Sequence, residues 1–117
     1  MNNLTTEVRP WGNYIILFES LNVKVKRIII NSGQAPSYQY HYKRMEHWIV
    51  VKGTGILTLD DIDRVVNAGE SIFIPRLAKH QLKNTGIEDL EFIEVQTGEY
   101  FGEDDIVRIK DNYGRIL

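Results

Sequence analysis

Two of the three histidines in the chain lie close together in the segment "SYQYHYKRMEHW", with a glutamate between them. In an extended strand, Gln39 and His41 are two residues apart and therefore share one face. Glu46 follows a short polar turn, so an antiparallel return of the chain can bring its carboxylate opposite that face. His80 is the remaining candidate donor, at the point where the chain re-enters a β-type run. The spacing predicts that these four side chains can converge on one point.

Together, these four side chains offer two nitrogen and two oxygen donors. Such a set suits a divalent cation such as zinc or manganese, with an open position for water or substrate. Spacing alone does not decide between a metal site and ordinary side chains, because a single histidine on a strand is more often a surface or packed residue than a ligand. On an extended segment, Arg44 would share the face of Glu46 and could reach a bound substrate. The alternative is that Arg44 is an exposed arginine in a turn. His47 is adjacent to Glu46 and is expected to point to the opposite face.

The elements that position these residues are predicted to be strands. Short segments rich in Ile, Val, Leu and aromatic residues alternate with Gly, Asn, Asp or Pro along the whole chain, which indicates an all-β sandwich or barrel. In "NVKVKRIII", we expect Val23 and Val25 on a dry face and Lys24 and Lys26 on a wet one. "TLDDIDRVV" predicts a hairpin with its two adjacent aspartates at the tip.

Length and composition indicate one domain over residues 1–117, with residues 1–7 as a flexible N-terminal segment. A net charge of -2 provides no broad basic field, so nucleic acid is not an expected partner. The short apolar runs predict no membrane span, and the N-terminus lacks a signal-peptide pattern, so a cytoplasmic protein is expected. Without cysteine, a metal must use histidine, carboxylate or amide ligands. We expect a homodimer that covers an exposed strand edge.

The spacing of glycines and proline around the two histidine motifs resembles the paired motifs of the cupin superfamily, a small double-stranded β-helix or jelly-roll barrel. Five stretches extend the resemblance to the C-terminal cupin domain of type II phosphomannose isomerases: "VRPWGNY", "YQYHYKRMEHWIVVKGTG", "GESIFIP", "KHQLKN" and "LEFIEVQTGEYFGEDDIVRIKDNYGR". In that family the domain usually follows a mannose-1-phosphate guanylyltransferase. No nucleotidyltransferase precedes it in this sequence, so guanylyl transfer is not expected of this chain.

The resemblance implies an isomerase that interconverts mannose 6-phosphate and fructose 6-phosphate through an enediol. It also places the metal on Gln39, His41, Glu46 and His80, with zinc as the first expectation and manganese, cobalt or nickel as alternatives. Tyr42 and Lys43 stand where the family has further histidines, which puts local substrate contacts in question. Two other functions stay open: a cupin isomerase or epimerase acting on another sugar or sugar nucleotide, and a non-catalytic cupin that binds sugar or metal.

Aldose-ketose isomerisation requires a group that polarises the carbonyl, a base that carries the proton and a cationic pocket for phosphate. The resemblance points to Arg108 as the active-site arginine. The proton carrier is open between Glu94 and an acid of the "EDD" triplet. The candidate catalytic residues are Arg44, Glu94, Asp104 and Arg108. The candidate contacts to the phosphosugar are Arg9, Trp11, Lys79, Tyr100 and Arg115.

Overall fold

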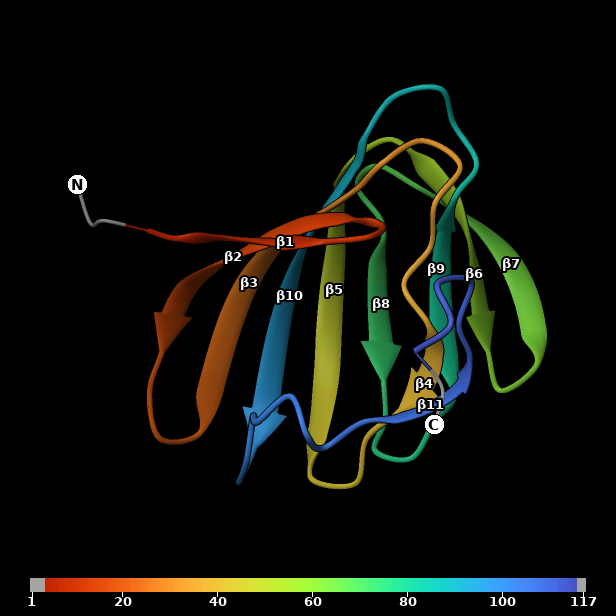
Figure 1. Cartoon of the computed structure of the whole chain (residues 1–117). Coiled ribbons are helices and arrows are strands. Elements are labelled where there is room, and N and C mark those ends of the chain that lie inside the picture. The colour runs from red at the N-terminus through yellow and green to blue at the C-terminus, as the bar shows by residue number, and fades with distance from the viewer. Residues whose placement is uncertain (1–3, 116–117) are drawn as a thin grey trace.

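The computed structural model describes residues 4–115, which form two sheets of strands joined by turns (Figure 1). The six-stranded sheet has the order β1-β2-β3-β10-β5-β8, and the five-stranded sheet has the order β11-β4-β9-β6-β7. The strands are β1 (Thr6–Arg9), β2 (Gly12–Glu19), β3 (Val23–Ile30), β4 (Tyr38–Tyr40), β5 (Arg44–Lys52), β6 (Thr54–Leu59), β7 (Ile62–Asn67), β8 (Ser71–Ile74), β9 (His80–Asn84), β10 (Leu90–Gly98) and β11 (Val107–Lys110). The all-β prediction is confirmed. Within residues 4–115, no helix has the length and apolar character needed to cross a membrane.

Strand β5 shows how the alternation of the sequence sorts side chains between the interior and the surface. Glu46, Trp48 and Val50 are buried between the sheets, whereas the residues between them face outward. His47 is on the outer face, where its ring packs against Phe73 with ring centroids 4.7 Å apart. The predicted outward orientation of His47 is therefore confirmed.

Strand β3 corrects the predicted facing of its lysines. Lys24 and Lys26 are 7% and 4% exposed, so they lie on the inner face rather than on a wet one. The reason is the parity of the strand: Ile28 and Ile30 enter the core, and every second residue before them shares that face. Lys26 donates to Glu103 over 2.8 Å, and its aliphatic stem packs in the interior.

The interior is apolar at one end and polar at the other. The apolar end is filled by large side chains from both sheets, and Ile30, Leu57, Val66 and Leu90 are fully buried there. Each such side chain contributes roughly 1.5–3 kcal/mol to folding by leaving water. The polar end lies where β5 begins and β10 ends. The apolar half therefore holds the two sheets together while the polar half is available for chemistry.

The hairpin between β6 and β7 has the predicted tip. Leu59 pairs with Ile62, and the two residues between them, Asp60 and Asp61, have φ angles of 47° and 68°. Positive φ at both central residues gives the tight turn whose twist matches that of the flanking strands.

Both ends of the described chain are tied into the sheets. Residues 1–3 of the predicted flexible segment lie outside the described residues, whereas Thr6 and Glu7 pair with β2 as part of β1. After β10, the chain crosses from the six-stranded sheet to the five-stranded one, where β11 pairs with β4 (Figure 1). This crossing brings the segment 101–106 against the polar end of the interior.

Candidate metal and ligand site

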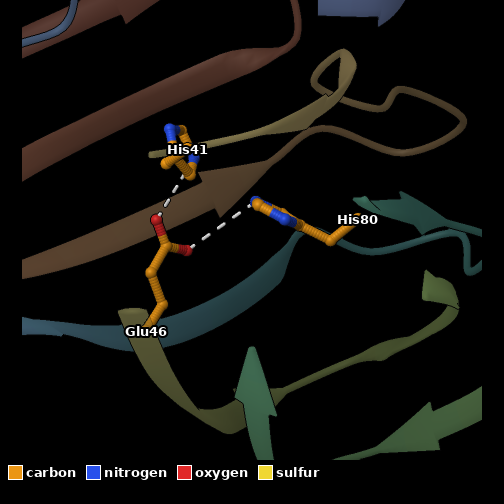
Figure 2. Close-up of side chains that lie close together, drawn as sticks. All are labelled: His41, Glu46 and His80. Atoms are coloured by element: carbon orange, nitrogen blue, oxygen red, sulfur yellow. Dashed lines mark ion pairs between the residues drawn. The ribbon is translucent and has the colours of Figure 1, made fainter. Parts of the chain in front are cut away.

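His41, Glu46 and His80 converge in the interior, as Figure 2 shows. His41 directly follows β4, Glu46 lies in β5, and His80 begins β9. Each offers one ligand atom, and these atoms lie within 4.8 Å of one another. The Nε2 atom of His41 is 3.4 Å from one oxygen of Glu46, and the Nε2 atom of His80 is 3.9 Å from the other. All three side chains are buried.

The backbone sets the tautomer of both histidines. The Nδ1 atom of His41 contacts the carbonyl oxygen of Asp105 over 2.6 Å, and that of His80 contacts the carbonyl oxygen of Ala78 over 2.9 Å. A carbonyl oxygen can only accept, so both Nδ1 atoms carry a hydrogen, and in the neutral form of each ring the Nε2 atom then presents a lone pair to the cluster. Burial also lowers the pKa of His41 to about 4, which keeps its ring neutral at neutral pH.

These donors fit a divalent cation. The Nε2 atom of His80 is buried and has no hydrogen-bond partner among the residues that the structure describes, although it is directed toward Glu46. Two imidazole nitrogens and a carboxylate are ligands that zinc and related metals accept. Gln39 lies opposite His80 in the β4–β9 pairing, and its amide oxygen now accepts from Ser37 over 3.1 Å. The assignment of Gln39 as the fourth ligand stays a prediction, as does the identity of the metal.

Glu46 is held by two further side chains of its own strand. The Nε1 atom of Trp48 donates to one carboxylate oxygen over 2.9 Å, and the Nε atom of Arg44 donates to the other over 3.0 Å. Burial opposes ionisation of Glu46, but its neighbours His80, Arg44 and His41 outweigh burial and bring its pKa to about 2. Glu46 is therefore a carboxylate throughout the physiological range.

A cavity of about 160 Å³ opens beside this cluster between the two sheets. Cationic and anionic side chains share its wall. The cations are Arg9, Lys26, Arg44, Arg108 and Arg115, and the acids are Glu46, Glu94 and Glu103. Burial, together with repulsion from Glu46, raises the pKa of Glu94 to about 8, although Lys26 and Arg44 act in the opposite direction. The site thus combines a candidate metal centre, several anion-binding groups and a carboxyl group that titrates near neutral pH.

The sequence profile of the family described as "Mannose-6-phosphate isomerase C-terminal" matches residues 1–111. The chain belongs to this family. Two relatives share nearly half of its residues. "Mannose-1-phosphate guanylyltransferase 2" of Escherichia coli O157:H7 is 47% identical over 105 residues, which are 90% of this chain and 22% of that protein. "Xanthan biosynthesis protein XanB" of Xanthomonas campestris pv. campestris (strain B100) is 48% identical over 107 residues, which are 92% of this chain and 23% of that protein. The chain therefore spans less than a quarter of the length of these relatives.

Solved structures show that the family domain has the cupin fold. An RmlC-like cupin from Shewanella frigidimarina NCIMB 400 superposes with a TM-score of 0.75 at 19% identity, covering 87% of this chain and 88% of that one. The capsular polysaccharide assembling protein CapF from Staphylococcus aureus gives a TM-score of 0.81 at 20% identity, covering 94% of this chain and 35% of that one. The predicted cupin is confirmed by these likenesses, which at such identities concern the fold alone.

The prediction that this cupin is a mannose-6-phosphate isomerase is wrong. The relatives at 47–48% identity are named for mannose-1-phosphate guanylyltransfer and xanthan biosynthesis. Membership of the family therefore does not assign that reaction to this chain. The physical reason is that one scaffold and one ligand cluster serve many chemistries, so membership of a family does not specify the bond that is made or broken.

The cavity brings together most of the side chains predicted from the sequence. It is lined by Arg9, Trp11, Gln39, Arg44, Glu46, His80, Glu94, Arg108 and Arg115, and His41 is buried beside it. Most of the residues come from strands of the two sheets, while Trp11 lies in the turn between β1 and β2, His41 directly follows β4 and Arg115 follows β11. Their roles as ligands, catalysts or substrate contacts remain proposals, but their proximity is a fact of the fold.

Three predicted site residues lie elsewhere. Lys79 pairs with Asp61 over 2.7 Å at the tip of the β6–β7 hairpin, on the surface. Tyr100 and Asp104 hydrogen-bond to each other on an outer surface, where Lys43 covers the tyrosine ring at 4.9 Å. None of the three lines the cavity. His80 and Glu103, the sequence neighbours of Lys79 and Asp104, line the cavity, but the side chains of the three residues themselves point outward.

Sequence reasoning missed two groups of the cavity wall, Lys26 and Tyr14, and did not single out Glu103 within its acidic triplet. Lys26 was expected on a wet face, and Tyr14 was not singled out at all. Glu103 belongs to an acidic triplet that is ordinarily solvated, yet it accepts from Lys26 over 2.8 Å and from the Tyr14 hydroxyl over 3.2 Å. A signal for Lys26 was available in the sequence, because the inward parity of Ile28 and Ile30 extends back along the strand. No comparable local signal marked Tyr14 or Glu103, whose contact spans 89 residues of sequence.

Proposed function

We propose that this chain is a metal-binding cupin that acts on an anionic sugar of polysaccharide synthesis, a sugar phosphate or a sugar nucleotide. We further propose that it is an isomerase or epimerase, moving a proton on a carbon next to a carbonyl group. The observation that carries the proposal is the position of Glu94, a buried carboxyl group with a pKa of about 8 in the same cavity as the His41–Glu46–His80 cluster.

The residues of the chain have distinct proposed roles. Glu94 takes a proton from the carbon and returns it, because a carboxyl group whose pKa is close to the working pH can do both. Arg108 binds the phosphate groups through paired N–H donors, and Trp11 packs against the sugar ring. Arg115, whose Nε and Nη2 atoms donate to the carboxylate of Asp111, contributes its remaining N–H donors at the cavity wall. His41, Glu46 and His80, with Gln39 as the proposed fourth donor, hold the metal. When bound, the metal supplies Lewis acidity toward a carbonyl oxygen.

The relatives suggest which anionic sugars to test. One of them is named for mannose 1-phosphate, whose anomeric carbon is blocked by the phosphate ester and which therefore has no carbonyl group to react. We propose mannose 1-phosphate and its guanylylated product as binding probes. Candidate substrates are keto-sugar nucleotides and open-chain sugar phosphates other than mannose 6-phosphate, because both carry an acidic C–H bond beside a carbonyl group.

The test is proton exchange, followed by NMR in heavy water. Zinc-loaded protein is incubated with a panel of open-chain sugar phosphates and keto-sugar nucleotides, beside chelator-treated protein. We expect deuterium at the carbon next to the carbonyl of at least one panel member, and only with metal. Glu94→Gln should lose this exchange. Glu91→Gln should retain it, because Glu91 lies on the same strand as Glu94 but its carboxylate faces outward and pairs with Arg27.

A second candidate function is a non-catalytic cupin that binds metal or sugar. It is favoured by the contact between Arg44 and Glu46, which neutralises the ligand carboxylate inside the protein. Binding of zinc and mannose 1-phosphate without exchange in any panel member would support this second function and contradict the first. The homodimer and the cytoplasmic location remain predictions, and light scattering of the purified chain tests the former.

A further inference from the structure

Arg44 engages the same atoms that the metal would use. Its Nε atom donates to Oε2 of Glu46 over 3.0 Å, and its Nη2 atom donates to Nε2 of His41 over 3.3 Å. The two acceptors are themselves 3.4 Å apart, so one guanidinium group bridges two of the three ligand atoms of the cluster. Arg44 is 5% exposed, and its position is thus part of the interior rather than of a surface turn.

The contact between Arg44 and His41 excludes a metal at the same nitrogen. The Nδ1 atom of His41 carries its hydrogen because it contacts the carbonyl oxygen of Asp105, so Nε2 has a single lone pair. That lone pair can accept an N–H bond from Arg44 or bind a cation, but it cannot do both. A guanidinium held beside Glu46 also repels a divalent cation. Metal binding therefore requires Arg44 to leave this position.

The cavity provides a place for the displaced guanidinium. The Nη1 atom of Arg44 is buried and has no hydrogen-bond partner in the part of the chain that the structure describes. It lies 4.0 Å from Oε2 of Glu103, across the cavity wall. The other oxygen of that carboxylate, Oε1, already accepts bonds from Lys26 and Tyr14, so Glu103 has a single oxygen to offer Arg44. An anionic group on a bound ligand offers paired acceptor atoms and is therefore the better partner for an arginine that moves into the cavity.

We propose that Arg44 couples metal binding to the binding of an anionic sugar, because Arg44 leaves the metal ligands when it binds the anion. Without ligand, Arg44 occupies the donor atoms of Glu46 and His41 and weakens the affinity of the site for metal. A phosphate group in the cavity draws Arg44 away and frees both donor atoms. By linkage, metal strengthens anion binding by the same factor by which the anion strengthens metal binding. This inference rests on the proposed function, and it adds a positioning role for Arg44.

The experiment measures zinc affinity by competition with a chromophoric chelator, so its readout does not depend on turnover. Wild type, Arg44→Met and Lys43→Met are each titrated alone, with mannose 1-phosphate and with neutral mannose. Lys43→Met is the matched control, because it removes the same charge one residue away, from a side chain directed at the ring of Tyr100 outside the cavity.

We expect Arg44→Met to bind zinc at least about tenfold more tightly than wild type, since it removes hydrogen bonds from a charged donor to both ligand atoms. Mannose 1-phosphate should tighten zinc binding to wild type and to Lys43→Met by about five- to tenfold, the lower range of known coupling factors. Neutral mannose should not. In Arg44→Met the effect of mannose 1-phosphate should disappear.

Three results would overturn the inference: equal zinc affinity of Arg44→Met and wild type, coupling that persists in Arg44→Met, or equal effects of mannose and mannose 1-phosphate. In each of these cases zinc still binds, so the proposed metal site survives. If zinc bound to none of the three proteins, that result would instead overturn the proposed function itself.

Discussion

Replacing Glu94 with glutamine should stabilise the protein at neutral pH while it removes the proposed proton carrier. Glu94 has a pKa of about 8 in the folded protein, because burial and the Glu46 carboxylate disfavour its charged form, against an ordinary value of 4.5. Between these two values the unfolded chain releases a proton that the folded protein retains. The folded state is therefore progressively penalised as pH rises from 4.5 to 8.

The size of the effect follows from this window. Each pH unit above 4.5 costs the folded protein about 1.4 kcal/mol relative to the unfolded chain. At pH 7 the accumulated penalty is about 3 kcal/mol, and at pH 5 it is less than about 1 kcal/mol. Glutamine has nearly the same shape and no charge, and its amide oxygen can still accept from Gln96, as Glu94 does now. Glu94→Gln should therefore recover most of this penalty.

Urea unfolding of chelator-treated protein at pH 5, 6, 7 and 8 measures the prediction. The difference in unfolding free energy between Glu94→Gln and wild type should grow with pH, reaching about 3 kcal/mol at pH 7. Glu91→Gln serves as the control, since it breaks a partly exposed pair with Arg27 that is worth less than about 1 kcal/mol. A difference that stays constant from pH 5 to pH 8 would refute the assignment of a protonated, buried Glu94.

Three further predictions concern the ligand cluster, the cavity and the frame. His80→Ala should lower zinc affinity by more than roughly 100-fold, which is the loss typical of removing a residue that only hydrogen-bonds to a ligand. His47→Ala, on the outer face, should bind zinc as tightly as wild type. If His80→Ala bound as much zinc as wild type, His80 would not be a ligand. Arg108→Lys should weaken mannose 1-phosphate binding about tenfold in calorimetry and leave zinc affinity unchanged, because lysine lacks paired donors; unchanged binding would make Arg108 a structural residue. Gly12→Ala should destabilise the folded protein by about 2 kcal/mol or more, because a Cβ there would lie 2.1 Å from the carbonyl oxygen of Ile29. Urea unfolding measures this, and a variant with the same urea midpoint as wild type would contradict it.

Local spacing was sufficient to predict two of the three members of the ligand cluster. His41 directly follows the short strand β4, which carries Gln39, and Glu46 returns on the next strand only a few residues later. Over such distances, the alternation of side chains and a tight turn leave few arrangements open. The all-β class and the β6–β7 hairpin were predictable for the same reason, since their signals lie within a few residues of sequence. His80 was predicted as the remaining histidine, and the family pattern then supported it.

Other features depended on contacts between distant segments. Alternation groups Lys24 with Lys26 but does not say which face is inside, and the burial of Ile28 and Ile30 in the core decided that. From the sequence, Lys79 and Tyr100 were predicted to contact the phosphosugar, yet the turns around them direct both side chains to the surface.

The chemistry of the site was settled at the level of tertiary structure. The pKa of Glu94 rises because β10 lies between β3 and β5, which places its carboxyl group in the interior near Glu46. Arg44 meets His41 because both side chains turn into one small space. A sequence determines which residue types can share a face within a strand. Burial, charge and competition for a lone pair depend on strands brought together across the whole chain, and they exist only once the two sheets have closed on each other.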